Sequence, residues 1–277
     1  MLKDAYRACK AALTAGGVED AAFEARCMLE HLTGYSRSAQ LAHSSDAFTQ
    51  QAALDEMVRR RLLHEPLQYI LGSWEFFGIP LCVGEGVLIP RDDTEVVLNL
   101  CLSGLKNQHD ARGIDLCAGS GAIAIALALH AGIQMTAVEL SDKAFYFLEK
   151  NINNLGAAVT AVRGDILRCH EDFADGAFDL IVSNPPYIRS GEIDSLQTEV
   201  QFEPRMALDG GSSGYDFYKA IVRNWSRKLK KGGMLAFELG EGQADTVRAM
   251  MAAQGFADIR TADDLGGIHR AIIGTML

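Results

Sequence analysis

The chain has 277 residues, of which 48% are hydrophobic and 22% charged, with 27 glycines and only 6 prolines. These proportions are typical of a globular protein with a full core, and they exclude a disordered or collagen-like chain. The formal net charge of −10 disfavours long-range attraction to phosphate backbones, so a nucleic-acid partner would require a local basic patch.

The first third of the chain has helical composition. Gly16 and Gly17 follow a first apolar and basic segment as a stop signal, and Thr49 is a plausible helix cap. Pro66 ends the last of these segments, because the residue before proline avoids helical geometry. We therefore expect helices at residues 5–13, 19–32 and 49–64, which would form a small bundle over residues 1–71.

The composition then becomes β-prone. Residues 69–77 and 81–83 are rich in aromatic and branched side chains, with Gly78 and Pro80 between them. This pattern predicts a β-hairpin, which would serve as a linker over residues 72–89.

From residue 90 onward, strand-like and helix-like segments alternate. This alternation predicts an α/β domain over residues 90–277, with a doubly wound parallel sheet and helices on both faces. Ligands of such sheets bind outside the carboxyl ends of the strands. The expected strands are residues 113–117, 135–139, 159–162, 178–183 and 234–238, and the expected helices are 122–130, 141–155 and 216–229.

The six cysteines are scattered and form no Cys-x-x-Cys pair, so we expect reduced thiols and no metal site. No apolar run reaches the length of a membrane span, and the N-terminus lacks the apolar stretch of a secretory signal. These features predict a cytoplasmic protein without a membrane partner.

Two basic clusters, at residues 59–61 and 228–231, are typical of solvated helix faces or helix ends. Residues 1–72 carry 8 basic against 9 acidic side chains, and the remainder carries 18 against 27. We therefore expect a protein or small-molecule partner and no direct nucleic-acid binding.

A glycine-rich segment, residues 115–121, follows the first expected strand of the sheet. Its two glycines allow a sharp turn, and the following helix should present free amides to a ligand. With Ala124 the segment fits a dinucleotide fingerprint, and Glu139 lies where a carboxylate would bind ribose hydroxyls. These residues predict a ligand with a ribose and leave NAD and S-adenosylmethionine open, as well as a tight turn without a ligand.

Asp165 and Ile166 follow the third expected strand of the sheet. In this setting Asp165 can accept a hydrogen bond from an adenine amino group while Ile166 packs on the ring. A loop aspartate that caps the next helix is an equal alternative.

The most specific motif is Asn-Pro-Pro-Tyr at residues 184–187, after the fourth expected strand. Two prolines fix the backbone and leave carbonyl groups without competing amides. The Asn184 side-chain oxygen and the Pro185 carbonyl suit the two hydrogens of a planar NH2 group, whose face would stack on Tyr187.

This motif resembles those of the S-adenosylmethionine-dependent methyltransferases that modify planar exocyclic nitrogens, namely adenine-N6 and cytosine-N4 of DNA and glutamine-N5 of proteins. Segments 75–78, 88–95, 202–211 and 264–270 make the chain similar, over essentially its whole length, to the bacterial release factor glutamine methyltransferases of the HemK/PrmC family. The chain departs from that family at Ala118, where threonine is usual, and at Asp92, where proline is common.

The resemblance implies a class I methyltransferase domain that binds S-adenosylmethionine and releases S-adenosylhomocysteine. The implied cofactor-binding residues are Asp115, Cys117, Ala118, Gly119, Ser120, Gly121, Glu139, Asp165, Ile166 and Asn184. The implied catalytic residues are Asn184, Pro185 and Tyr187, and Pro186 completes the substrate pocket. Further contacts are expected from the loop residues Arg91, Thr94 and Glu203, although Arg91 could equally form a structural ion pair with Glu95.

The implied reaction is methylation of N5 of the glutamine in the Gly-Gly-Gln motif of peptide chain release factors, which act in translation termination. The helical bundle would then dock the factor. Three alternatives stay open from the sequence: a ribosomal-protein glutamine as acceptor, DNA adenine-N6, and a non-catalytic or dehydrogenase-like dinucleotide-binding module.

Overall fold

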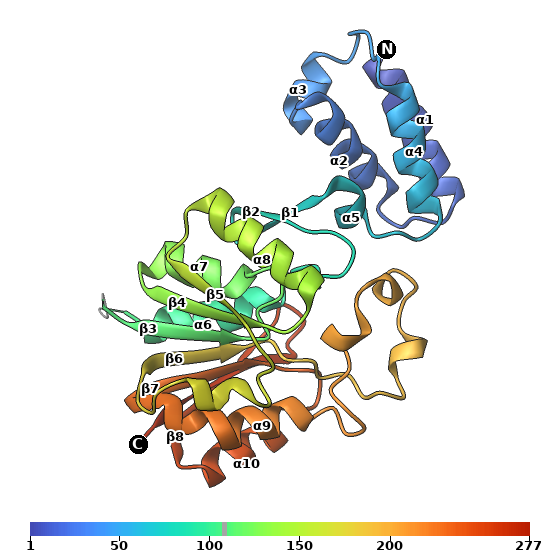
Figure 1. Cartoon of the computed structure of the whole chain (residues 1–277). Coiled ribbons are helices and arrows are strands. Elements are labelled where there is room, and N and C mark those ends of the chain that lie inside the picture. The colour runs from blue at the N-terminus through green and yellow to red at the C-terminus, as the bar shows by residue number, and fades with distance from the viewer. Residues whose placement is uncertain (107–109) are drawn as a thin grey trace. The chain divides into compact units, whose positions relative to one another are not determined.

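The computed structural model describes residues 1–106 and 110–277, which divide into two compact units (Figure 1). The helical unit consists of Met1–Ser73 and Gln197–Phe202, and the sheet unit consists of Trp74–Leu196 and Glu203–Leu277. The chain therefore passes between the units three times. No helix among the described residues is long and apolar enough to cross a membrane.

The helical unit buries one apolar face of each of its longer helices, with Leu13, Leu29 and Leu54 at most 1% exposed. Its fourth helix starts later than the sequence predicted: Gln50, and not Thr49, precedes it, and no side chain caps it. Its helices are α1 Leu2–Ala15, α2 Ala21–Thr33, α3 Arg37–Ala42, α4 Gln51–Leu62 and α5 Leu67–Leu71.

The hairpin is shorter than predicted, because its expected first residues are helical. Tyr69 and Ile70 belong to α5 and are buried, and the left-handed Gly72 ends that helix by donating its amide to the Gln68 carbonyl. The two strands are β1 Ser73–Phe76 and β2 Ile79–Cys82.

The basic cluster at residues 59–61 is not uniformly solvated, which corrects the sequence-based expectation. Arg61 is 8% exposed, and its guanidinium group donates to Glu24 at 2.7 Å and to Glu199 at 3.1 Å. Arg59 is exposed and pairs with Glu56 on the same helix. A buried charge is retained only where partners compensate its desolvation, so Arg61 holds α2, α4 and the 197–202 segment together within the helical unit.

We expect Arg61→Ala to lower the unfolding free energy of the helical unit by about 3 kcal/mol, because Glu24 is left buried without its partner. Arg59→Ala is the matched control and should cost less than about 1 kcal/mol, since its ion pair is exposed. Urea unfolding of both variants measures the difference; equal midpoints would show that the buried pair carries no special stability.

The sheet unit contains one seven-stranded sheet in the order β5-β4-β3-β6-β7-β9-β8. The first five of these are parallel, as predicted, whereas β9 runs antiparallel to both β7 and β8, so the sheet is mixed. The strands are β3 Arg112–Leu116, β4 Gln134–Glu139, β5 Val159–Arg163, β6 Phe178–Ser183, β7 Leu229–Glu238, β8 Phe256–Asp263 and β9 His269–Met276.

Helices cover both faces of this sheet, with α7 and α8 on one side and α9 and α10 on the other (Figure 1). The core is accordingly split into two apolar layers, one on each face of the sheet. Tyr218 and Trp225, both on α9, are buried in the layer between the sheet and the helices α9 and α10. The helices are α6 Thr94–Gly104, α7 Ala122–Ala131, α8 Asp142–Leu155, α9 Asp216–Trp225 and α10 Ala244–Ala253. Short 3-10 helices span Cys169–Asp172, Ile193–Ser195, Val200–Phe202, Arg205–Ala207 and Ser226–Lys228.

Strand register brings the expected functional loops to one edge of the sheet. Leu116 at the end of β3 lies opposite Val138 of β4 and Ser183 of β6. The chain continues from β3 to β4 and β5 on one side of β3, and then to β6 and β7 on its other side. The strand order therefore reverses at β3, and ligands of such sheets bind at the carboxyl edge of this switch point.

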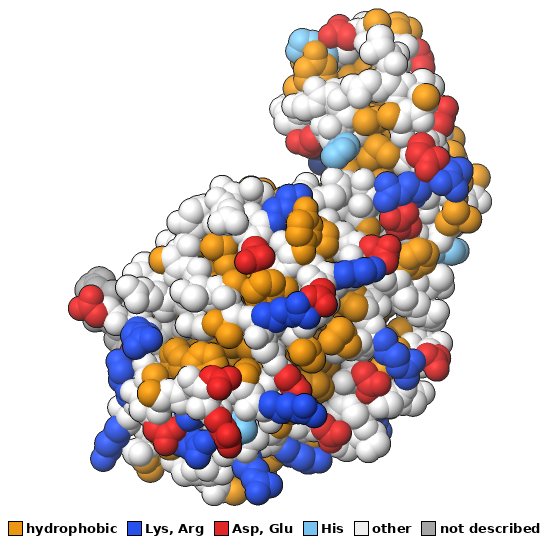
Figure 2. Space-filling view, viewed as in Figure 1, with side chains coloured by type: hydrophobic (Ala, Val, Ile, Leu, Met, Phe, Trp, Pro, Cys, Tyr) orange, Lys and Arg blue, Asp and Glu red, His pale blue; other side chains and the backbone are white. Residues whose placement is uncertain are grey.

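The surface of the sheet unit mixes charges of both signs on the face shown in Figure 2. The second basic cluster is again not simply solvated: Lys228 is 3% exposed and donates to the Phe173 carbonyl and to Asp175, both at 2.6 Å. This lysine is therefore a structural residue and not part of a surface patch.

Candidate active site

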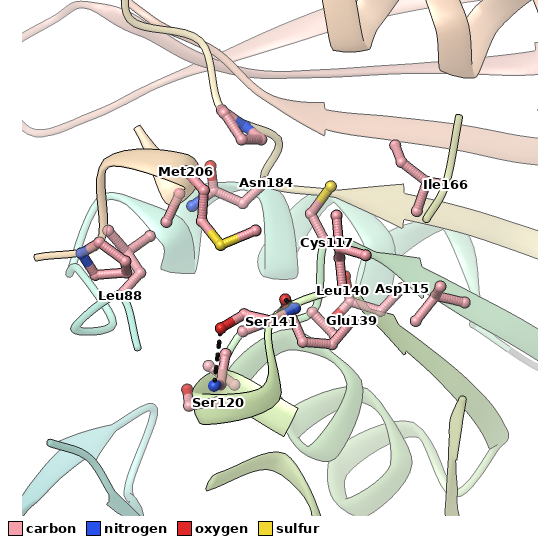
Figure 3. A pocket seen from close by; sticks show the side chains of 18 of the residues that line it. Leu88, Asp115, Cys117, Ser120, Glu139, Leu140, Ser141, Ile166, Asn184 and Met206 are labelled. Atoms are coloured by element: carbon pink, nitrogen blue, oxygen red, sulfur yellow. Dashed lines mark hydrogen bonds between the residues drawn. The ribbon is translucent and has the colours of Figure 1, made fainter. Parts of the chain in front are cut away.

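A cavity of about 310 Å³ lies at the carboxyl edge of the parallel strands. Eleven of the residues expected from the sequence to bind a ligand line it: Thr94, Asp115, Cys117, Ala118, Gly119, Ser120, Glu139, Asp165, Ile166, Asn184 and Pro186. Five others do not line it: Arg91, Gly121, Pro185, Tyr187 and Glu203. Figure 3 shows Asn184 and Met206 side by side, across the cavity from Glu139 and Ser141.

Several lining residues were not assigned a role from the sequence. They are mostly apolar or small, and they complete the walls around the predicted motifs. They are Gly86, Leu88, Pro90, Ala122, Ile123, Val138, Leu140, Ser141, Ala144, Gly164, Pro204, Met206, Ala207, Asp209 and Phe217.

The glycine-rich turn needs left-handed backbone at three positions. Gly119 has φ 57°, Gly121 has φ 85°, and Cys117, a residue with a β-carbon, has φ 66°. A β-carbon added to Gly121 would lie 2.6 Å from the Leu148 side chain, so this glycine lets the turn pack closely on α8. Gly121 does not line the cavity, but its close packing on α8 holds the turn that does.

Three amides of this turn are occupied by partners within the protein. The Ala118 amide donates to the Val138 carbonyl, the Gly121 amide donates to the Ala118 carbonyl, and the Gly119 amide donates to Glu139. These three amides are therefore not offered to a ligand phosphate.

Glu139 ties together the loops that follow β3 and β4. One carboxylate oxygen accepts from the Gly119 amide at 2.8 Å, and the other accepts from the Ser141 amide at 2.7 Å. The side chain is 9% exposed and lines the cavity. A carboxylate has about four acceptor positions, so Glu139 can still accept hydrogen bonds from ligand hydroxyls.

Asp115 is a buried carboxyl group with unused capacity. Its Oδ2 accepts from the Ala124 amide at 3.1 Å, whereas Oδ1 has no hydrogen-bond partner among the described residues. Burial raises the pKa of Asp115 to about 8, and the nearby Glu139 acts in the same direction. A cationic ligand group beside Asp115 would favour its ionised form.

The electrostatic character of the cavity follows from its acidic lining. Glu139, Asp165 and Asp209 line it together with Asp115, which keeps its proton up to pH of about 8 unless a cationic group lies beside it, and no Lys, Arg or His is among its described lining residues. This set of charges favours a positively charged ligand and disfavours a pyrophosphate. In residues 1–106 and 110–277, no cluster of three or more His, Cys, Asp or Glu side chains could hold a metal ion.

Asp165 accepts a local backbone hydrogen bond and also lines the cavity. Its Oδ1 accepts from the Leu167 amide at 2.9 Å, which caps the turn after β5, and its side chain also lines the cavity. Ile166 is 4% exposed and lies in the same wall. An apolar side chain beside a carboxylate acceptor suits a flat ring with an amino group.

The Asn-Pro-Pro-Tyr segment divides between the cavity and the core. The Asn184 Nδ2 donates to the Thr94 hydroxyl oxygen at 3.4 Å. Tyr187 turns away from the cavity lining, and its hydroxyl donates to Glu238 at 3.4 Å. Glu238 was missed from the sequence, although it ends a strand just as Glu139 does.

Arg91 forms its ion pair with Glu203. The alternative raised from the sequence was a pair with Glu95, so the partner differs from that expectation. Glu203 is 5% exposed, and its other oxygen accepts from the Ile89 amide at 3.0 Å. This pair fastens the segment before α6 to the loop that contains Pro204, which lines the cavity. Arg91 and Glu203 therefore support the cavity wall indirectly.

Comparisons with known proteins agree along the chain. A family model described as "PrmC N-terminal domain" matches residues 4–72, and one described as "Methyltransferase small domain" matches residues 91–205. A release factor glutamine methyltransferase of Geobacter sulfurreducens is 43% identical over 93% of this chain and 90% of its own length. One of Caulobacter vibrioides is 34% identical over 99% of this chain and 96% of its own length.

Solved structures share the fold at low sequence identity. The catalytic domain of hMettl16 in complex with the MAT2A 3′UTR hairpin 1 aligns with a TM-score of 0.59 and 14% identity, over 82% of this chain and 80% of that one. A methyltransferase from Pyrococcus furiosus aligns with a TM-score of 0.53 and 18% identity, over 72% of this chain and 90% of that one. Both likenesses concern the fold alone.

The raised pKa of Asp115 predicts a pH-dependent stability difference from Asp115→Asn. Folded Asp115 keeps a proton up to pH of about 8, whereas the unfolded chain releases it near the ordinary value of 3.8. The wild type should therefore lose stability relative to Asp115→Asn as pH rises between these values, by at most about 1.4 kcal/mol per pH unit. Urea midpoints of both proteins across pH 4–9 measure this effect, and parallel curves would contradict it.

Proposed function

The chain belongs to the release factor glutamine methyltransferase family, and we propose that it methylates N5 of the glutamine in the Gly-Gly-Gln motif of peptide chain release factors. Family membership, expected from the sequence motifs, is confirmed, and the chain is an S-adenosylmethionine-dependent glutamine methyltransferase. The observation that best supports the proposed chemistry is an acidic cavity with the Asn184 amide in its wall.

The residues present fit S-adenosylmethionine better than a dinucleotide. The unpartnered Oδ1 of Asp115 and the acidic lining suit a ligand that carries positive charges, whereas the occupied amides of the glycine turn disfavour a pyrophosphate. In the proposal, Glu139 accepts from ribose hydroxyls, and Asp165 and Ile166 flank the adenine. When bound, S-adenosylmethionine supplies an electrophilic methyl group attached to a sulfonium sulfur.

The proposed role of residues 184–187 is to hold and activate the substrate amide. An amide nitrogen is a poor nucleophile, because its lone pair is delocalised into the carbonyl group. The Asn184 oxygen and the Pro185 carbonyl would accept its two N–H groups, which raises electron density on nitrogen and stabilises the positive charge that it acquires. The same two bonds orient the nitrogen, and such positioning is worth several kcal/mol.

Tyr187 takes a different place in this proposal from the one that the sequence suggested. Its ring packs beside the core layer under α9 and α10, and its hydroxyl reaches Glu238. Burial raises the pKa of Tyr187, so the hydroxyl stays protonated and remains a donor. We therefore propose that Tyr187 anchors the segment that carries Asn184, in place of stacking within the cavity.

For the helical unit we propose a role in docking the release factor. Its surface exposes the large apolar side chains Phe23, Leu41 and Leu63, each at least 54% exposed. The match of residues 4–72 to the PrmC N-terminal domain supports this assignment.

The function is tested by transfer of a labelled methyl group from S-adenosylmethionine. The acceptors are a purified release factor, the same factor with its Gly-Gly-Gln glutamine changed, a short peptide with that motif, a ribosomal protein and unmethylated DNA. We expect label on the intact factor, none on the changed factor, and less on the peptide, which lacks the docking surface. Label confined to the ribosomal protein or to DNA would overturn the proposed acceptor.

Asn184→Ala should reduce kcat at least about a hundredfold while the Kd for S-adenosylmethionine changes little, because the lost acceptor acts mainly in the transition state. Single-turnover methylation and calorimetric titration separate the two quantities. Glu192→Ala, a change at an exposed residue of the same loop that pairs with Arg189 at 3.6 Å, serves as a control and should keep kcat. Near-normal turnover of Asn184→Ala would contradict the proposed mechanism.

A further inference from the structure

A buried amide side chain lies behind the Asn-Pro-Pro-Tyr segment. Gln243, which directly precedes α10, is 8% exposed and does not line the cavity. Its Nε2 donates to the Tyr187 carbonyl at 3.1 Å and to the Gly214 carbonyl at 3.2 Å, and its Oε1 accepts from the Gly240 amide at 3.0 Å. One side chain therefore bonds to the backbone of the loop after β6, the loop before α9 and the loop after β7.

The chemistry of these partners fixes the orientation of the Gln243 amide. A backbone carbonyl can only accept and a backbone N–H can only donate, so the NH2 group must face Tyr187 and Gly214 while the oxygen faces Gly240. The Tyr218 hydroxyl can also donate to this oxygen, at 3.2 Å. Both ends of the amide are thus paired with groups that no rotation of the amide could satisfy in the opposite sense.

Two glycines bring the backbone of the neighbouring loop close to Tyr187. A β-carbon added to Gly214 would lie 2.6 Å from the Tyr187 carbonyl oxygen, and one added to Gly210 would lie 2.7 Å from the Tyr187 α-carbon. Only glycine allows approaches this close, so the two loops lie in direct contact where Gln243 bonds to both.

The Asn-Pro-Pro-Tyr segment is held at both ends. At its start, Ser183 is the last residue of β6 and is paired with neighbouring strands of the sheet. At its end, Gln243 holds the Tyr187 carbonyl. The two prolines between them have fixed φ, so few bonds of the segment remain free to rotate. Holding both ends therefore restricts the directions of the Asn184 side chain and the Pro185 carbonyl.

Gln243 also acts on a second part of the cavity wall. The loop before α9 contributes Met206 to the lining, and it pairs with the chain just beyond Tyr187 through the parallel bridge between Ile188 and Asp209. That bridge joins the two loops to each other. Gln243 joins both of them to the loop after β7, a strand that pairs with β6 in the sheet.

We propose that Gln243 is a positioning residue for methyl transfer. By holding the Tyr187 carbonyl, it sets the directions in which Asn184 and Pro185 accept from the substrate amide. The inference rests on the proposed function, which assigns these two acceptors. The cofactor loops that Glu139 joins follow β3 and β4, whereas the backbone partners of Gln243 lie after β6, before α9 and after β7. Gln243 therefore acts on the rate of transfer and not on cofactor affinity.

The test compares wild type, Gln243→Glu and Gln243→Met in methyl transfer to the release factor. Glutamate keeps the shape but places a second oxygen against the two carbonyls, and methionine, unbranched and of similar length, removes all of the hydrogen bonds. We expect kcat to fall about tenfold or more in both variants, because a small misplacement of reacting groups costs this much. The Kd for S-adenosylmethionine should stay within about twofold.

Tyr218→Phe separates positioning from a general loss of stability. It removes a buried hydroxyl beside the same amide, together with its bond to the Glu238 carbonyl, but it leaves both Nε2 bonds of Gln243 in place. We expect it to lower the unfolding midpoint while kcat stays within about twofold of wild type. Single-turnover rates of all variants are measured well below their unfolding midpoints.

A double variant tests whether Gln243 acts through the proposed acceptors. Added to Asn184→Ala, Gln243→Met should lower kcat by a smaller factor than it does in wild type, because part of its effect passes through the Asn184 side chain. A defect that is only structural would multiply in full with that of Asn184→Ala.

The outcomes distinguish this inference from the proposed function. If the wild type methylates the factor while Gln243→Glu and Gln243→Met keep kcat, the positioning role is wrong and the proposed function stands. The same holds if Tyr218→Phe lowers kcat as much as the Gln243 variants do, or if the effects of Gln243→Met and Asn184→Ala multiply in full. Absence of any methylation by the wild type overturns the proposed function and this inference together.

Discussion

The site depends first on the carboxylate of Glu139. By accepting from the amides of Gly119 and Ser141, it fixes the turn after β3 to the start of α8 and so forms one wall of the cavity. The same bond removes the Gly119 amide as a donor, which makes the turn a poor phosphate binder. One carboxylate therefore both joins the two loops that form this wall and occupies an amide of the turn.

Much of this arrangement could be predicted from the sequence, because it is local. The alternation of strands and helices predicted the parallel part of the sheet, and the residues that follow its strands, such as Cys117, Asp165 and Asn184, do line one cavity. The antiparallel strands β8 and β9 lacked a comparable local pattern. At residues 69–71, β-prone composition gave way to helix because Tyr69 and Ile70 are buried in the helical unit.

What the sequence could not reveal are partners brought together only by folding. Arg61 looked like part of a solvated cluster, yet its carboxylate partners lie 37 and 138 residues away. Arg91 pairs with Glu203, 112 residues on, although Glu95 lies one helical turn away. Glu238 likewise accepts a hydrogen bond from Tyr187, which lies 51 residues earlier. Spacing rules describe neighbours on one element, and these contacts join different ones.

The division of the chain into units has a consequence for recombining this protein with its relatives. Residues 197–202 belong to the helical unit although they interrupt the sequence of the sheet unit, and Glu199 there completes the ion pairs of Arg61. A chimaera that exchanges only residues 1–73 would combine the Arg61 of one parent with the residue at position 199 of the other. The ion pair between Arg61 and its own Glu199 would then be lost. Modular exchange within this family must therefore transfer two segments, and a single crossover point does not respect the boundaries of the fold.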